Sequence, residues 1–462
     1  MFRWLMVLLV VAAVIGGAVY VVTGRSPAPS IAIDKPDRVA GRKATLEVTV
    51  GAPRAHLTSL VVSVEQGGRT TNLFSLDTPE SGTITQVDAD RLRVTRPFGT
   101  ESVPALHSGA ARIVVSASRP SFLDLHTLAS AASRDIQIDL EPPPVAVVST
   151  HHYVNHGGSE LVVYRTASSE VVSGVRVGDM EYHGYPASDA GLGAADPALR
   201  VAFFALLHDQ DLKTPIAVFA RDEAGNEATT PFVDAVFEKR FRRSRIVLDD
   251  RFLQRVVPDI LAHSPELNMP APSGDVLPAF LKINGELRRR NADRIAEIVS
   301  ATSASRLWRG PFVQLGNSQV EAGFADHRTY LYGAKEVDQQ VHLGFDLAAT
   351  AGVPVAAANS GRVLHAAWLG IYGNCVVVDH GMGVASLYGH LSSIAVKVGD
   401  TVTKGQALGK SGMTGLAGGD HLHFTMLVNG RAVNPVEWWD PHWIQDRVDR
   451  KLGGPAGGSV AR

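Results

Sequence analysis

The strings His342-Leu343-Gly344-Phe345-Asp346 and His421-Leu422-His423-Phe424, near the C-terminus, decide the fold of the region around them. In each string the polar side chains are an even number of positions apart, and an extended strand places residues i, i+2 and i+4 on one face. His342 and Asp346 therefore share a face if the first string is extended, as do His421 and His423 in the second. Imidazole and carboxylate groups bind zinc, and three protein ligands with one open position are typical of a catalytic zinc site. Scattered structural histidines are the alternative, which is disfavoured because the pattern occurs twice in Gly-rich sequence.

Residues 311–443 surround these strings with short Gly- and Val-rich runs and almost no helical period. The runs at 353–358, 361–365, 374–380 and 384–390 are typical of successive strands. The sequence therefore predicts a β domain over 311–443. Cys375, the single cysteine of the chain, lies in one of these runs, so a disulfide within the chain and a cysteine-based zinc site are both excluded.

The rest of the chain predicts a mainly β protein with several domains. Short alternating strands separated by turns predict a β-sandwich module over 31–140 and a second, immunoglobulin-like module over 145–236, with Pro142-Pro143-Pro144 at the boundary. A helical period over 246–305, with Asp249 or Asp250 as a helix cap, predicts a helical linker. The Gly-rich residues 453–462 predict a disordered tail.

Residues 4–22 form an uncharged, almost wholly apolar run close to the N-terminus. A helix of that length crosses roughly 30 Å of hydrocarbon, so residues 1–25 predict an uncleaved membrane anchor. A cleaved signal peptide is the alternative, although its apolar region is usually shorter. Either interpretation places the remaining chain outside the cytoplasm. The formal net charge of −2 gives no general attraction to nucleic acid, and no nucleic-acid partner is expected.

Residues 323–440 resemble the lysostaphin-type (LytM-like) zinc metallopeptidases, which cut peptide bonds in bacterial peptidoglycan. The motifs that carry the resemblance are His342-x-x-x-Asp346, Tyr388-Gly389-His390-Leu391, and Ser411-Gly412-x-Thr414-Gly415 leading into His421-Leu422-His423-Phe424. Supporting segments lie at 352–357, 361–363, 373–374, 379–381 and 398–406.

The resemblance implies a small, mainly antiparallel β domain with one zinc ion, held by His342, Asp346 and His423. It implies that His390 and His421 stand beside the metal as catalytic residues. Histidines, with a pKa near 6.5, suit proton transfer, so His421 is expected to act as general base and His390 as oxyanion stabiliser or acid. The sequence leaves the division between these two residues open.

Together these features predict a membrane-anchored, zinc-dependent endopeptidase that hydrolyses the peptide cross-links of peptidoglycan. Its expected location is the inner or cytoplasmic membrane, crossed once, with the catalytic domain on the periplasmic or cell-wall side. Its expected partners are peptide stems, the membrane, and a regulatory protein that contacts the β modules. Two alternatives stay open: a non-catalytic cell-wall protein that activates other hydrolases, and a protease with a target outside the wall. A helix or loop within 246–330 is expected to cover the groove.

Overall fold

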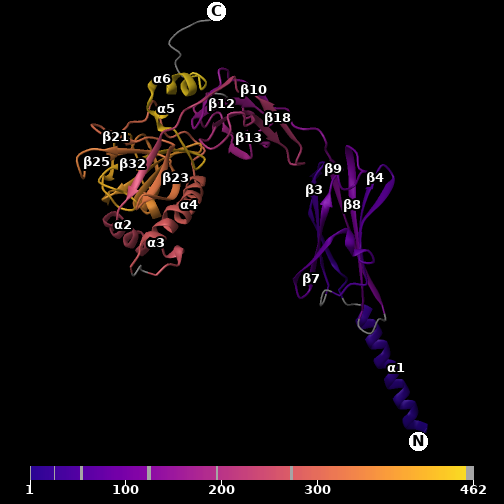
Figure 1. Cartoon of the computed structure of the whole chain (residues 1–462). Helices are drawn as coiled ribbons and strands as arrows, with labels where there is room; N and C mark the ends of the chain where they lie inside the picture. Colours follow the sequence, from indigo (N-terminus) through magenta and orange to yellow (C-terminus); the bar gives the residue numbers. More distant parts are fainter. Residues whose placement is uncertain are drawn as a thin grey trace, which may run out of the picture. The chain divides into compact units, whose positions relative to one another are not determined.

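The computed structural model describes residues 2–24, 27–52, 56–121, 126–193, 196–270 and 274–453 (Figure 1). These residues divide into two compact units, one made of 1–143 with 221–228 and the other of 144–220 with 229–462. The protein is mainly β with an N-terminal apolar helix, as the sequence predicts. The predicted disordered tail lies, from residue 454 onward, outside the described residues.

The N-terminal helix α1 spans Phe2–Gly24, and its residues Trp4–Val22 are long and apolar enough to cross a membrane. None of that stretch is buried by the rest of the chain. A run of exposed apolar side chains has no favourable contact in water, so it suits either a bilayer or a signal sequence.

The first unit contains two sheets whose inward side chains form one core. Leu46, Val48 and Val50 of one sheet and Val62 and Val64 of the other are buried in this core, which follows from the period-two pattern of these strands. In spatial order, the first sheet holds β1 (Ser30–Lys35), β3 (Ala44–Gly51), β7 (Arg91–Phe98) and β6 (Thr83–Asp88). The second holds β2 (Val39–Ala40), β9 (Thr127–Ile138), β8 (Gly109–Pro120), β4 (Ser59–Gln66) and β5 (Arg69–Ser75). The assignment of this region as a sandwich module stays a prediction.

Three further sheets lie within residues 146–237, which belong to the second unit except for residues 221–228. One holds β10 (Ala146–Val147), β12 (Ser159–Arg165), β16 (Leu199–Ala205) and β15 (Tyr185–Pro186). The next holds β14 (Met180–His183), β13 (Val172–Val177), β17 (Ile216–Arg221) and β18 (Glu227–Pro231). The third pairs β11 (Tyr153–Asn155) with β19 (Ala235–Phe237) in parallel.

An eight-stranded sheet forms the centre of the C-terminal region. Its strands are β21 (Gln319–Ala322), β24 (Phe345–Ala348), β32 (Leu422–Val428), β28 (Val384–Leu391), β27 (Asn374–Gly381), β26 (Gly361–Trp368) and β30 (Thr401–Val402), with β33 (Arg431–Val433) paired to β32. Every pairing in it is antiparallel. A small sheet of β25 (Pro354–Ala356), β31 (Ala407–Lys410) and β29 (Ser393–Ile394) accompanies it.

The central strands β27, β28 and β32 of the eight-stranded sheet are buried on both faces. Along β27, Cys375 and Val377 pack on one face against helix α4 (Arg288–Ser300), whereas Val376 and Val378 pack on the opposite face. We call the first of these the helix face. Because side chains alternate along a strand, each residue of the sheet lies on one of these two faces.

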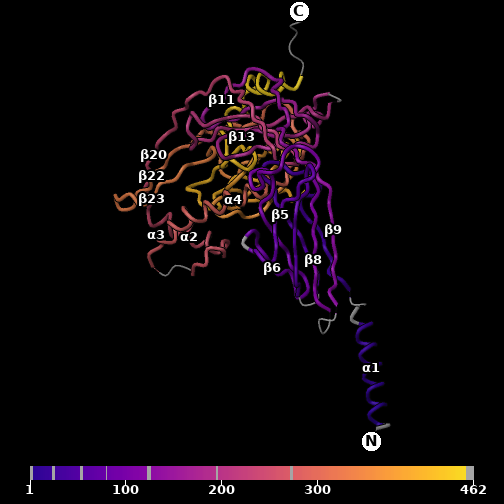
Figure 2. Tube along the Cα trace, turned by 90° about the vertical axis from the view of Figure 1, so that its right-hand side faces the viewer, coloured from indigo at the N-terminus to yellow at the C-terminus, as the bar shows by residue number. Residues whose placement is uncertain are grey.

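Three helices lie between residues 250 and 300, as the helical period predicts. They are α2 (Asp250–Ala262), α3 (Leu277–Lys282) and α4, with a π-helical turn at Ile283–Leu287 between the last two. Asp249 caps α2 by accepting a hydrogen bond from the backbone N–H of Phe252. The apolar sides of α2 and α3 pack against a three-stranded sheet of β20 (Arg243–Leu248), β22 (Asp326–Tyr332) and β23 (Lys335–His342), which Figure 2 shows beside these two helices.

The region 146–237 and the C-terminal region share one apolar core. Trp308 and Trp438 both contact Phe203 of β16, with ring centroids 6.3 and 5.7 Å apart. Trp438 belongs to α5 (Pro435–Trp439), which α6 (Pro441–Trp443) and a π-helical turn at Ile444–Asp449 follow. The buried carboxylate of Glu437 accepts hydrogen bonds from Asn155 and from the backbone N–H of Ser159. The division into separate domains at 145–236, 246–305 and 311–443 therefore stays a prediction.

Candidate metal centre

Three side chains from different strands meet on the helix face of the eight-stranded sheet. Asp346 of β24 lies directly opposite His423 of β32 in the antiparallel register, so both side chains point to the same face. His342 is the last residue of β23, which belongs to the neighbouring three-stranded sheet. The first string is therefore not one continuous strand, because the chain bends at Leu343–Gly344 between two sheets. The bend brings His342 back over Asp346.

The ligand atoms of these three residues form a compact triangle. The Oδ1 atom of Asp346 lies 2.9 Å from His342 Nε2 and 3.0 Å from His423 Nδ1, and the two nitrogens are 3.1 Å apart. All three residues are almost completely buried. Two imidazole nitrogens and one carboxylate oxygen converging in this way could hold a metal ion, and the donor set suits zinc.

The outer nitrogens of both histidines are engaged by acceptors, which fixes the tautomers. His342 donates its Nδ1–H to the carbonyl oxygen of Gly323 at 3.0 Å, which leaves the Nε2 lone pair facing the triangle. The hydroxyl of Thr425 donates to the carbonyl of Leu343 at 2.9 Å, so it accepts the Nε2–H of His423 at 3.0 Å. His423 therefore presents the lone pair of Nδ1. Such outer partners orient metal-binding histidines and raise their basicity.

Gly344 leaves room for the hydrogen bond between His423 and Thr425. A Cβ atom at this position would lie 2.6 Å from both His423 Nε2 and Thr425 Oγ1. Real Cβ atoms do not approach other atoms that closely, so a larger residue at the bend would displace the imidazole or the hydroxyl.

His390 and His421 flank the triangle. His421 precedes β32, and its Nε2 lies 3.4 Å from Asp346 Oδ1 while its Nδ1 donates to the carbonyl of Gly419 at 2.9 Å. His390 donates its Nδ1–H to the carbonyl of Thr414 at 2.8 Å, and its ring centroid lies 4.8 Å from that of His421. Both residues therefore turn Nε2 toward the centre.

His390 reaches the centre through an irregularity in β28. Ala385 and Leu387 lie on the helix face, and simple alternation would place His390 on the opposite face. The register between β27 and β28 shifts between Tyr388 and Leu391, and His390 has a φ of +63°. Non-glycine residues rarely adopt this conformation, and such strain is typical of functional sites.

The charges of the cluster act on one another strongly. Burial opposes the ionisation of Asp346, but His342, His421 and His423 together lower its pKa well below the usual value. Burial also lowers the pKa of His423 to about 4, which keeps this imidazole neutral and able to act as a ligand. Burial and then the neighbouring His421 and His423 lower the pKa of His390. Burial works in the same direction on His421, but Asp346 more than offsets it and raises the pKa.

The site also contains residues that the sequence did not single out. Arg328 of β22 forms an ion pair with Asp346 Oδ2 at 3.0 Å, and its Nε lies 3.5 Å from Asp326 Oδ2. Arg288, from the start of α4, and Tyr372 line the cavity of about 100 Å³ in front of the histidines. Period two from His423 could have indicated Thr425. No local signal marked the two arginines, because they come from other sheets and helices.

Helices from the predicted covering segment contact the walls of this cavity. Arg255 of α2 donates to the carbonyl of Ala417 at 2.7 Å, and Asn291 of α4 accepts from the backbone N–H of Ile371 at 2.9 Å. Ile371 and the neighbouring Leu416 both line the cavity.

Another buried histidine, His380, lies outside this site. Its Nδ1 lies 2.8 Å from the carbonyl of Ser360 and its Nε2 lies 2.7 Å from the hydroxyl of Ser386. The ring packs edge-on against Phe312, which belongs to the core on the face opposite α4.

Comparison with known proteins places the site in a family. Residues 340–435 match Peptidase family M23. A DD-carboxypeptidase/endopeptidase, Mpg, from Neisseria meningitidis serogroup B is 41% identical over 97 residues, which cover 21% of this chain and 22% of that protein. The peptidoglycan DD-endopeptidase ShyA of Vibrio cholerae is 31% identical over 166 residues, which cover 36% of this chain and 35% of the relative.

The murein hydrolase activator EnvC of Escherichia coli is 43% identical over 95 residues, 21% of this chain and 23% of that protein. The chain thus spans about a fifth to a third of the length of these relatives. The matched segment contains all five residues of the histidine and aspartate cluster. The C-terminal part of this chain therefore carries a peptidase family M23 domain.

Proposed function

We propose that this protein is a membrane-anchored, zinc-dependent endopeptidase that hydrolyses peptide cross-links of bacterial peptidoglycan. The observation that carries the proposal is the buried triangle of His342, Asp346 and His423, whose free lone pairs face one another. Three inward lone pairs without a proton between them repel unless a cation lies among them. The names of the relatives from Neisseria and Vibrio support peptidoglycan as the substrate.

In this proposal, His342 Nε2, His423 Nδ1 and Asp346 Oδ1 hold the zinc ion. The ion supplies Lewis-acid activation of a water molecule near neutral pH. Arg328 holds the second oxygen of Asp346, so the carboxylate keeps Oδ1 directed at the two imidazoles. Thr425 and the Gly323 carbonyl hold the imidazole rings in place.

His421 and His390 move the protons. Each has its Nδ1–H fixed on a backbone carbonyl, so the neutral ring presents Nε2 as a proton acceptor and the protonated ring presents it as a donor. We assign the general base to His421 because its Nε2 lies beside the ligand cluster, 3.4 Å from Asp346 Oδ1. His390 then donates to the developing oxyanion or to the departing amine.

The helix α1 would anchor the chain in the inner or cytoplasmic membrane with the peptidase domain on the outer side. Its apolar, unburied stretch Trp4–Val22 supports this arrangement. The β modules over 31–140 and 145–236 would then act as spacers or as a surface for a regulatory protein.

The test combines metal analysis with hydrolysis of purified sacculi by the full chain. We expect one zinc per chain and release of muropeptides whose masses identify the peptide bond that is cut. Chelation of the metal should abolish release, and addition of zinc should restore it. A zinc-loaded, folded protein that releases nothing from sacculi but cuts a soluble Gly-rich protein would contradict the peptidoglycan substrate.

A second candidate is a non-catalytic activator of other wall hydrolases, which the similarity to EnvC favours. The two candidates differ in metal content. A folded chain that contains no zinc, releases no muropeptides and yet stimulates a separate hydrolase would support the activator. The presence of all five residues of the cluster supports the enzyme.

A further inference from the structure

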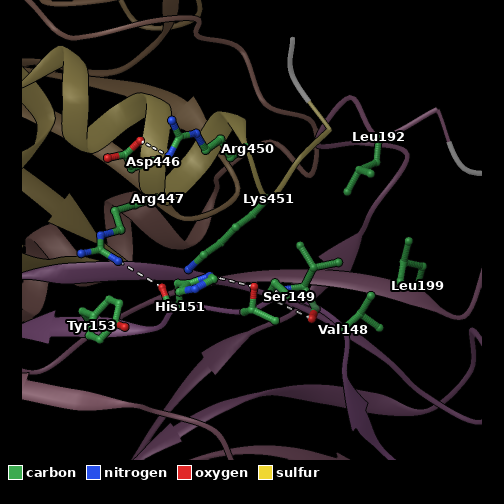
Figure 3. Close-up of a pocket in the computed structure, with 12 residues that line it drawn as sticks. Val148, Ser149, His151, Tyr153, Leu192, Leu199, Asp446, Arg447, Arg450 and Lys451 are labelled. Carbon is green, nitrogen blue, oxygen red and sulfur yellow. Dashed lines mark hydrogen bonds and ion pairs between the residues drawn. The ribbon is translucent and has the colours of Figure 1, made fainter. Parts of the chain in front are cut away.

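A second, larger cavity lies between the strands near residue 150 and the C-terminal helical segment. Its volume is about 690 Å³, within the range of roughly 300–1,000 Å³ typical of ligand pockets. Figure 3 shows Asp446, Arg447, Arg450 and Lys451 on one side and Val148, Ser149, His151 and Tyr153 on the other. We call this cavity the basic pocket. None of its lining residues belongs to the candidate metal centre.

The polar lining of the basic pocket is cationic. Three basic side chains and one carboxylate line it. Arg450 pairs with Asp446 at 2.8 Å, and its side chain is 59% exposed. Arg447 donates Nη1–H to the carbonyl of His151 at 3.1 Å and stacks over the ring of Tyr153 with 4.8 Å to the centroid. Its Nε lies 3.8 Å from Oε2 of the buried Glu160, a carboxylate that it shares with Lys451. Two forked guanidinium groups suit a carboxylate.

A buried ion pair holds the two sides of the pocket together. Lys451 Nζ lies 3.0 Å from Glu160 Oε1, and both side chains are at most 5% exposed. Lys451 also donates to the carbonyl of Leu161, and Glu160 accepts the backbone N–H of Leu161. A buried pair of this kind contributes little net stability but fixes geometry when its hydrogen bonds are complete. The pocket is therefore preorganised, with the helical segment fixed to β12.

The remaining wall of the pocket is apolar. Val148, Val163, Leu192 and Leu199 line it, and Val148 is half exposed. His151 beside them has a φ of +62°, a strained conformation for a residue other than glycine. An occupant thus combines an anionic group with small apolar groups.

We propose that the basic pocket binds a short peptide through its free terminal carboxylate, with Arg447 and Arg450 as the anion partners and Val148 and Leu199 beside its small side chains. The inference rests on the proposed function, because uncleaved peptide stems supply such ends next to the cross-links. The pocket then acts as a docking site for substrate, separate from the metal centre. Its volume suits a few residues, and its slight excess of positive charge suits one carboxylate rather than a polyanion.

The experiment uses the zinc-loaded full chain in detergent and the tripeptide acetyl-Ala-Ala-Ala, as the acid and as the C-terminal amide. We expect the acid to bind at least about 10-fold more tightly than the amide, because the amide loses the charge-assisted hydrogen bonds. A diazirine-bearing form of the acid should crosslink to residues 148–153 or 446–451, as located by mass spectrometry.

Matched substitutions test which side chains bind the carboxylate. Arg450→Gln and Arg447→Gln should each weaken binding of the acid about 10-fold and leave binding of the amide unchanged. Arg290→Gln is the control, because Arg290 forms a comparable i,i+4 ion pair on an exposed helix face. Arg450 is largely exposed, so its variant tests the pocket even if the Arg447 variant folds poorly.

Three results would overturn the inference: equal affinity for acid and amide, crosslinks outside the two segments, or wild-type binding by both variants. Sacculus hydrolysis, measured in parallel, separates this inference from the proposed function. Hydrolysis without carboxylate binding refutes the docking site alone. Carboxylate binding without hydrolysis refutes the endopeptidase and leaves the pocket as a peptide site.

Discussion

The two faces of the eight-stranded sheet each bury a histidine, and the two residues differ in what their nitrogens meet. On the helix face, His423 directs Nδ1 at the lone pairs of His342 and Asp346. On the opposite face, each nitrogen of His380 meets a fixed backbone carbonyl or hydroxyl. Burial alone therefore does not mark a functional histidine. The informative feature is an inward nitrogen that faces other acceptors and so needs a cation.

The strongest test of this contrast removes a group from the triangle. His342→Ala and the nearly isosteric Asp346→Asn should each lose zinc and activity together. The loss should exceed the factor of about 10–100 that is typical when a hydrogen-bond partner of a metal ligand is removed. Metal analysis and sacculus hydrolysis measure both effects. His442→Ala, at an exposed histidine, is the control. A His342→Ala protein that keeps one zinc per chain would show that the triangle is not the metal site.

Changing a histidine beside the triangle should separate metal binding from turnover. His421→Ala is expected to keep zinc and to lose about 10²–10⁴-fold in rate, which is the usual contribution of a general base. Zinc content measures metal binding, and the rate of muropeptide release measures turnover. Full activity in this variant would refute the assignment of His421 as base and transfer the role to His390.

On the opposite face, His380 should change the pH dependence of folding stability and should have no role in catalysis. Burial lowers its pKa to about 4 in the folded chain, against 6.5 in the unfolded chain. The unfolded state therefore takes up a proton first as the pH falls, so stability is lost between about pH 6.5 and 4, by about 3 kcal/mol in full, and is unaffected above pH 6.5.

Denaturant unfolding of the full chain at pH 7 and pH 5 measures this effect. His380→Gln should reduce the difference in unfolding free energy between the two pH values, whereas His442→Asn should leave it unchanged. An identical pH dependence in wild type and His380→Gln would contradict a neutral buried imidazole.

The smallest predicted effect comes from the orientation of His423. Thr425→Val keeps the shape of the side chain but removes the hydroxyl that accepts the Nε2–H of His423. Zinc affinity should fall about 10–100-fold, as measured by competition with a chelator. Thr425→Ser, which keeps the hydroxyl, should bind zinc nearly as tightly as wild type. Equal losses in both variants would point to packing rather than to the hydrogen bond.

The sequence predicted much of the local structure near the site. The strand runs at 374–380 and 384–390 correspond to β27 and β28, and Asp249 caps α2. The even spacing of His421 and His423 correctly placed both on one face. These predictions succeed because period and capping depend on neighbours in the chain, which the sequence displays directly.

The sequence by itself determined which side chains were available for metal and proton chemistry and that they lie on or beside strands. The tertiary structure alone decided how they meet. The bend at Gly344 carries His342 from one sheet to the next, and a register shift with a positive φ turns His390 to the helix face. The basic pocket joins residues near 150 to residues near 450. Bends, register shifts and such distant pairings arise from packing between elements, and local sequence preferences do not encode them.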